Sequence, residues 1–113
     1  MASNITKYTS QEALNQIVGG VSAKVLTADG QVKATAGTVH SVMVSVNGAT
    51  AGDKIEIKNS ADNSGTALLS FVATAAAQSW MFSPSAGVEF TSAIYADVTL
   101  TGSATCSVTI VYS

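Results

Sequence analysis

The fold is decided by a stretch that reads Val39-His40-Ser41-Val42-Met43-Val44-Ser45-Val46. Within it, valine alternates with methionine or serine over the last five positions. Successive side chains of a β-strand point to opposite faces, so this alternation predicts a strand with one face against a core. We expect the valines at the even positions to point inward, and Ser41, Met43 and Ser45 to point the other way.

The two-residue period recurs along the chain, interrupted by clusters of Gly, Asn, Asp and Ser. Short strands with turns at this spacing are typical of a sandwich or barrel, and no long helical pattern separates them as in a parallel α/β sheet. The sequence therefore predicts an all-β fold, an antiparallel β-sandwich of the jelly-roll or immunoglobulin type, over residues 21–113. The expected strands, about eight in number, cover residues 21–27, 31–35, 39–46, 54–58, 67–74, 79–83, 93–101 and 105–112, and residues 85–92 form a turn or a further short strand.

Several positions in these strands carry specific expectations. Ile55 and Ile57 should face the core, and so should the apolar residues of 93–101 and 105–112, whereas Tyr95 and Asp97 should point outward. Asp29-Gly30 is a strong signal for a β-hairpin between the first two strands. Pro84 should end its strand or place it at a sheet edge.

Residues 1–20 have a different pattern, which predicts an N-terminal arm followed by a short helix. Thr9 and Glu12 fit a capping box, Leu14 and Ile17 follow at helical spacing, and two glycines would end the helix. A helix this short is marginal alone and must pack on something. The alternative is an extended arm lying on a neighbouring molecule.

Charged residues make up only 11% of the chain, the net charge is −2, and the five basic residues are all lysines scattered along the sequence. Nucleic-acid binding needs a concentrated basic surface, so we expect no nucleic-acid partner. No apolar run is long enough to span a membrane, and no signal peptide is apparent. Because isolated monomers normally carry charge to stay soluble, this scarcity hints that much of the surface is covered in an assembly.

Groups that could carry chemistry are few. His40 is the single histidine, Cys106 is the single cysteine and is expected to be a buried apolar residue, and no nucleophile-elbow or phosphate-loop motif is present. Residues 59–65 hold oxygen ligands of the kind that calcium uses, but the order of an EF-hand is missing, so an ordinary turn is favoured. We therefore expect a protein that is not an enzyme and that takes no metal, cofactor or small-molecule substrate.

The aromatic residues Trp80, Phe82, Phe90 and Tyr95 have two interpretations. Phe82 and Phe90 are expected in the core, whereas Trp80 fits a core position or an interface about equally well, since aromatic residues are enriched at interfaces. A carbohydrate-binding module that uses Trp80 and Tyr95 as a sugar platform is a further alternative. That alternative requires both rings to be exposed on one face.

From about residue 36 onward the chain resembles small structural proteins of tailed-bacteriophage virions, above all capsid decoration (cement) proteins and head-fibre-like modules. The matching segments are Ala36-Gly37-Thr38-Val39, 55–59, Ser64-Gly65-Thr66, 82–90, Ala93-Ile94-Tyr95-Ala96, Gly102-Ser103-Ala104 and 108–112, although related sequences often have Gly where this one has Ala93.

The resemblance implies a protein made in the host cytoplasm that sits in many copies, or as a homo-oligomer, on the capsid exterior. There it would bind the major capsid protein and stabilise the shell. A head-fibre, tail or adaptor component is the alternative within the virion. The residues we expect at capsid or subunit interfaces are Ile5, Tyr8, Leu14, Ile17, Trp80 and Tyr95.

Overall fold

The computed structural model of the chain describes residues 20–113, where all regular structure is β-strand and every strand pairing is antiparallel. The predicted all-β antiparallel sandwich is confirmed, with one strand more than expected because residues 85–92 contain the short strand β7. No helix in the described part of the chain could cross a lipid bilayer. The strands are β1 (Ser22–Leu26), β2 (Gly30–Lys33), β3 (Gly37–Asn47), β4 (Lys54–Asn59), β5 (Thr66–Val72), β6 (Gln78–Phe82), β7 (Val88–Phe90), β8 (Ile94–Thr99) and β9 (Thr105–Tyr112).

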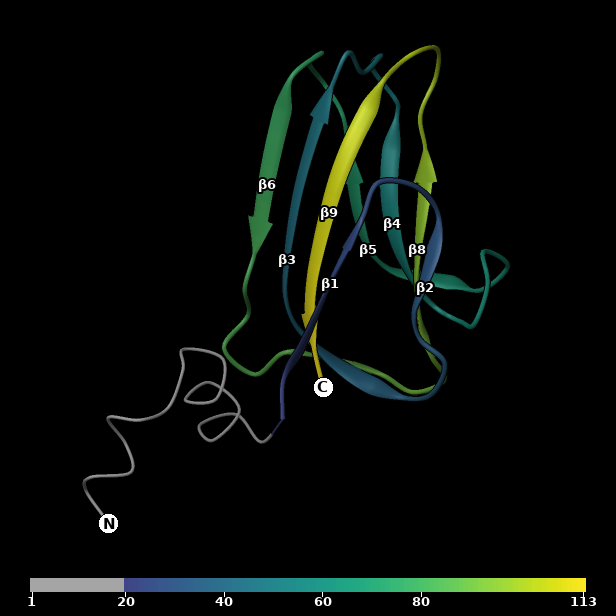
Figure 1. Cartoon of the computed structure of the whole chain (residues 1–113), viewed down its shortest axis with the longest axis vertical. Helices are drawn as coiled ribbons and strands as arrows, with labels where there is room; N and C mark the ends of the chain where they lie inside the picture. The colour runs from purple at the N-terminus through teal and green to yellow at the C-terminus, as the bar shows by residue number, and fades with distance from the viewer. Residues whose placement is uncertain (1–19) are drawn as a thin grey trace, which may run out of the picture.

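The strands form two sheets that lie as two layers (Figure 1). The first sheet has the order β1-β9-β3-β6, with β7 also paired to β3, and the second has the order β2-β8-β4-β5. The long strands β3 and β9 form the centre of the first sheet. The free edges are therefore β1 and β6 in one sheet, and β2 and β5 in the other.

The core lies between the sheets and is built from the alternating residues that the sequence predicted. Val42, Val44 and Val46 are buried on β3, and Ile55 and Ile57 are buried opposite them on β4. Strands β8 and β9, with Leu100 directly after β8, add the expected inward residues, of which Val98, Leu100 and Tyr112 are only partly buried against the cluster. Remaining buried members include Val32, Val39, Phe90, Ile94, Ala96, Cys106, Val108 and Ile110.

The expected hairpin at Asp29-Gly30 is wrong, because β1 and β2 do not pair with each other. β1 pairs with β9 in the first sheet, and β2 pairs with β8 in the second. The connecting loop crosses from one layer to the other, and the Asp29 carboxylate accepts a hydrogen bond from the Val98 amide of β8 at 2.5 Å. Val32 on β2 is buried in the core. The burial of Val32 and the hydrogen bond between Asp29 and Val98 outweigh the preference of Asp29-Gly30 for a hairpin turn.

Strands β6 and β7 follow one another along the same edge of β3. β6 pairs with residues 42–46 of β3 and β7 pairs with residues 37–39, so the two strands form one edge interrupted at Pro84. The expectation that Pro84 ends an edge strand is confirmed. Gly87 in the interruption has a φ of +73°, and a side chain there would lie 2.7 Å from the Thr38 methyl group. Only glycine fits this turn without strain.

The predicted N-terminal arm and short helix lie outside the described residues. The same holds for four of the expected interface residues, Ile5, Tyr8, Leu14 and Ile17.

Candidate functional site: two unlike sheet faces

Over strands β1, β9, β3 and β6, the outer face of the first sheet carries no charged side chain. The one charge on this side is Glu89 of β7, which pairs with Thr38 near the end of β3. The strand alternation and register place uncharged residues on this face, and we call this set the uncharged face: Ala23, Val25, Ser41, Met43, Ser45, Ser79, Met81, Ser107, Thr109 and Val111. Half of them are small and polar, and the other half are apolar. Since none of them is charged, covering this face would remove no full charge from water.

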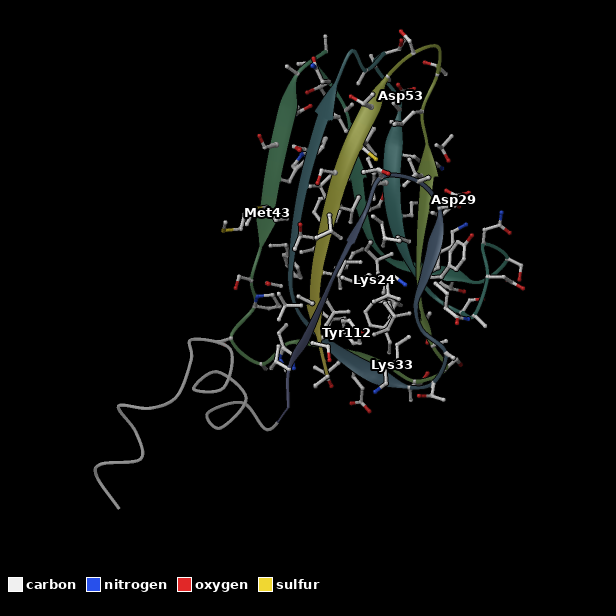
Figure 2. All side chains as sticks on the ribbon, viewed as in Figure 1. Lys24, Asp29, Lys33, Met43, Asp53 and Tyr112 are labelled. Carbon is white, nitrogen blue, oxygen red and sulfur yellow. The ribbon has the colours of Figure 1, made fainter. Side chains whose placement is uncertain are left out.

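One apolar row crosses this face from edge to edge. Val25 pairs with Thr109, Thr109 pairs with Met43, and Met43 pairs with Met81, so the four side chains stand side by side on four neighbouring strands. Val25, Met43 and Met81 have exposed fractions of 62%, 51% and 71%. Figure 2 labels Met43 on this sheet. Methionine is flexible and polarizable and adapts well to partner surfaces.

The outer face of the second sheet is its opposite in character. Lys54, Glu56 and Lys58 alternate along β4, as the sequence suggested for a solvated side, and Lys58 forms an ion pair with Asp97 of β8 at 2.7 Å. A second ion pair joins Lys54 and Glu56 at 3.4 Å. The hydrogen bond to Asp97 raises the pKa of Lys58 above its ordinary value. This face is already electrostatically paired and suits contact with water.

Trp80 and Tyr95 lie on different sheets and do not form one platform. Trp80 on β6 is partly buried against the core, and its ring lies 6.0 Å from the Phe71 ring of β5. Tyr95 on β8 is paired with Lys58 and points outward beside Asp97, as predicted. The sugar platform that the carbohydrate-binding alternative requires is therefore not present with these two residues. Of the core predictions, Phe90 is fully buried, whereas Phe82 is only partly buried.

His40 forms one contact that the sequence did not reveal. Its Nε2 atom lies 2.8 Å from the Ser113 Oγ atom, and the Ser113 backbone exchanges two hydrogen bonds with Thr38. The contact joins residues 73 positions apart, which only the β3–β9 pairing brings together. Within residues 20–113 no hydrogen bond joins His40 to a carboxylate, so the third group of a catalytic triad is missing from the described contacts.

The loop of residues 59–65 is a turn held by its own side chains. Asp62 accepts hydrogen bonds from the Ser60 hydroxyl and from the backbone and hydroxyl of Ser64. These bonds lower the pKa of Asp62. No cluster of potential metal ligands occurs among the described residues.

Asp53 is a buried carboxylate whose role the sequence did not show. It accepts hydrogen bonds from the Thr50 amide and from the amide and hydroxyl of Thr101, 48 residues away. The Thr50 amide is the main cause of a lowered pKa for Asp53. Asp53 thereby ties the loop after β3 to the loop after β8.

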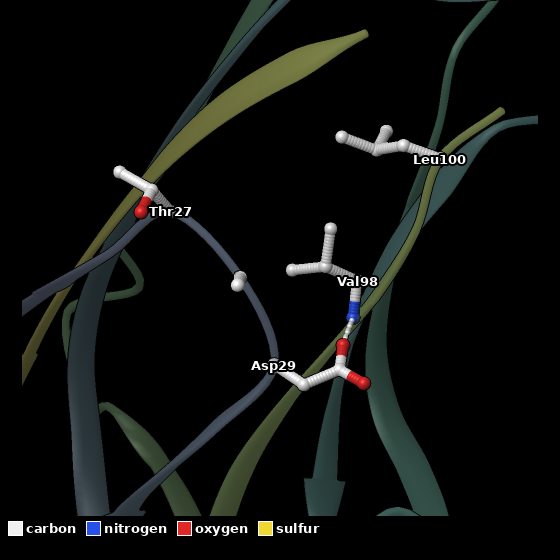
Figure 3. Close-up of a pocket in the computed structure, with 5 residues that line it drawn as sticks. Thr27, Asp29, Val98 and Leu100 are labelled. Atoms are coloured by element: carbon white, nitrogen blue, oxygen red, sulfur yellow. Dashed lines mark hydrogen bonds between the residues drawn. The ribbon is translucent and has the colours of Figure 1, made fainter. Parts of the chain in front are cut away.

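A shallow depression lies where the β1–β2 loop crosses to the second sheet (Figure 3). It has a volume of about 320 Å³ and is lined by Thr27, Ala28, Asp29, Val98 and Leu100. The Asp29 carboxylate there accepts a hydrogen bond from the Val98 amide. Nearby, Cys106 is buried as predicted, its thiol lies 3.6 Å from the Thr27 carbonyl oxygen, and burial raises its pKa. This arrangement holds the loop in place.

Comparison with known protein families and with curated proteins found no match for this chain.

Proposed function

We propose that this chain is a non-enzymatic structural protein of a bacteriophage virion that decorates the capsid. In this role it binds the outer surface of the shell of major capsid protein through the uncharged face and stabilises the shell. The observation that carries the proposal is the segregation of charge between the two sheets. One outer face bears the ion pairs of β4 and β8, and the other bears no ion pair and a single charge, Glu89 of β7, outside the four strands of the uncharged face.

The physical argument concerns the cost of covering each face. Burying the charged face would require removing Lys54, Glu56 and Asp97 from water, whereas burying the uncharged face removes only hydroxyl groups and apolar side chains. The exposed row of Val25, Met43 and Met81 supplies apolar area for the contact. The resemblance of the sequence to capsid decoration proteins supports the outer surface of a capsid as the partner surface.

The size of the face also fits a repeated, individually weak attachment. Four strands about 4.8 Å apart and roughly six residues long cover on the order of 400 Å² per partner, about half of a standard interface. A contact this small becomes durable when many copies act on one lattice.

The proposal is tested by adding the purified protein to emptied, expanded heads of the phage that encodes it and by following shell melting in a calorimeter. We expect saturable binding and a higher melting temperature of the shell. Met43→Asp, which places a charge at the centre of the row, should weaken binding by roughly tenfold or more. Thr99→Asp adds the same charge to an exposed position on the other face, beside Lys54, and should bind normally.

Equal binding by both variants would contradict the choice of face. Absence of binding to heads, together with binding to tails or formation of a closed ring in solution, would overturn the decoration role and favour a fibre, tail or adaptor component.

A further inference from the structure

The four free sheet edges of residues 20–113 are not equally protected. β1 carries Lys24 at its centre and β2 ends at Lys33, both labelled in Figure 2, and β2 also has an irregular register against β8. Edge lysines and irregularities are the usual means of preventing one sheet from pairing with another. Strand β6 has only five residues, and Pro84 follows two residues after its end, another such means.

Strand β5 has less protection of this kind, and its one irregularity is a register shift against β4 between the Ile57–Leu69 and Lys58–Ala67 pairs. Its seven residues, Thr66-Ala67-Leu68-Leu69-Ser70-Phe71-Val72, include no charge and no proline. Leu68 and Val72 have exposed fractions of 41% and 47% on the outer side, and Leu69 and Phe71 are only partly buried on the inner side. Such an edge presents unpaired backbone groups beside apolar side chains, and in water it is unfavourable to leave it open.

The sequence of β5 is also complementary to itself. If two copies pair antiparallel about Ser70, Leu68 of one copy faces Val72 of the other, and Leu69 faces Phe71. Ala67 faces Ala73, and Ser70 faces its own equivalent. Every apolar side chain meets an apolar side chain, and such cross-strand pairs stabilise an antiparallel sheet. The β1 edge cannot do this, because pairing β1 about its centre would place Lys24 opposite Lys24.

We infer that the β5 edge is a homotypic pairing site, at which a second copy of this chain joins to give one continuous eight-stranded sheet. The two copies are related by a twofold axis through the Ser70 pair, so the interface closes on itself and forms dimers. The contact is a single strand pair about 23 Å long, so the dimer is in concentration-dependent equilibrium with the monomer.

Sedimentation velocity of the purified protein from about 5 to about 500 µM tests this site. We expect a rising dimer fraction for the unchanged protein. Ser70→Glu should raise the dimer dissociation constant by roughly tenfold or more, because two added carboxylates face each other and each also lies beside Glu56 of its own sheet. Met43→Asp, a charge of the same sign on the other sheet, should dimerise like the unchanged protein.

A charge-swap experiment excludes simple misfolding of the variant. Ser70→Lys mixed with Ser70→Glu places opposite charges across the twofold axis, so the mixture should contain more dimer than either variant alone. A monomer over the whole concentration range would overturn the inference. So would equal weakening by Met43→Asp and Ser70→Glu, or a mixture with no more dimer than its components.

Discussion

The burial of alternate valines can be tested with two chemically identical substitutions. Val44 on β3 is fully buried between the sheets, whereas Val25 on β1 has an exposed fraction of 62%. Val→Ala removes two carbon atoms at either site, worth about 1.6 kcal/mol of apolar transfer when the side chain is buried. The cavity left beside Trp80 and Val108, the neighbours of Val44 on β6 and β9, adds to this cost. We expect Val44→Ala to lower the free energy of unfolding by about 2–3 kcal/mol and Val25→Ala by less than about 0.5 kcal/mol.

Urea unfolding followed by tryptophan fluorescence measures both costs, because Trp80 packs against the core cluster. Thermal unfolding should show a fall of roughly 10–20 °C for Val44→Ala and little change for Val25→Ala. The loss of β-branching is common to the two variants, so it does not contribute to their difference. Similar costs at the two sites would refute the assignment of inner and outer faces on which both proposals depend.

Two further predictions concern the loops. The pKa of Asp53 is lowered in the folded state, so its carboxylate stabilises the fold above the ordinary aspartate pKa, and this stabilisation is lost as pH falls through the folded value. In urea titrations, the free energy of unfolding of Asp53→Asn should therefore be clearly below that of the unchanged protein at pH 6, and the difference should be smaller near pH 2–3. An equal difference at both pH values would contradict this role. Gly87→Ala should lower the melting temperature more than Gly102→Ala does. Both glycines have a positive φ, but of the two only a side chain at position 87 meets a neighbour, the Thr38 methyl group. An equal fall in melting temperature for the two variants would show that this close approach is unimportant.

Most of the strand content and the direction of the side chains could be predicted from the sequence, because both depend on a local period of two residues. Val42, Val44, Ile55 and Ile57 are buried as that period requires. The pairing of strands could not be predicted in the same way. The Asp29-Gly30 signal is local, and it was overridden by the Val98 amide, 69 residues away.

Only part of the candidate site could be predicted from the sequence, for the same reason. Alternation shows that Met43 and Met81 point away from the core, but only the strand order places them beside each other and in line with Val25. The low charge of the chain was evident from composition, whereas its segregation between the two outer faces depends on which strands share a sheet. Trp80 and Tyr95 were predicted as interface residues from their residue type. Residue type does not show which of the two sheets a residue belongs to.

The two proposed contacts are geometrically compatible. An antiparallel strand pair has its twofold axis perpendicular to the sheet, so joining two second sheets at β5 leaves both uncharged faces pointing in the same direction. A dimer of this kind presents two uncharged faces on the same side of the assembly. Linking two weak contacts raises the overall affinity by a factor of about 10²–10⁴ when the spacing of the sites matches. The edge that pairs and the face that docks would then act together, each too small to give a durable attachment alone.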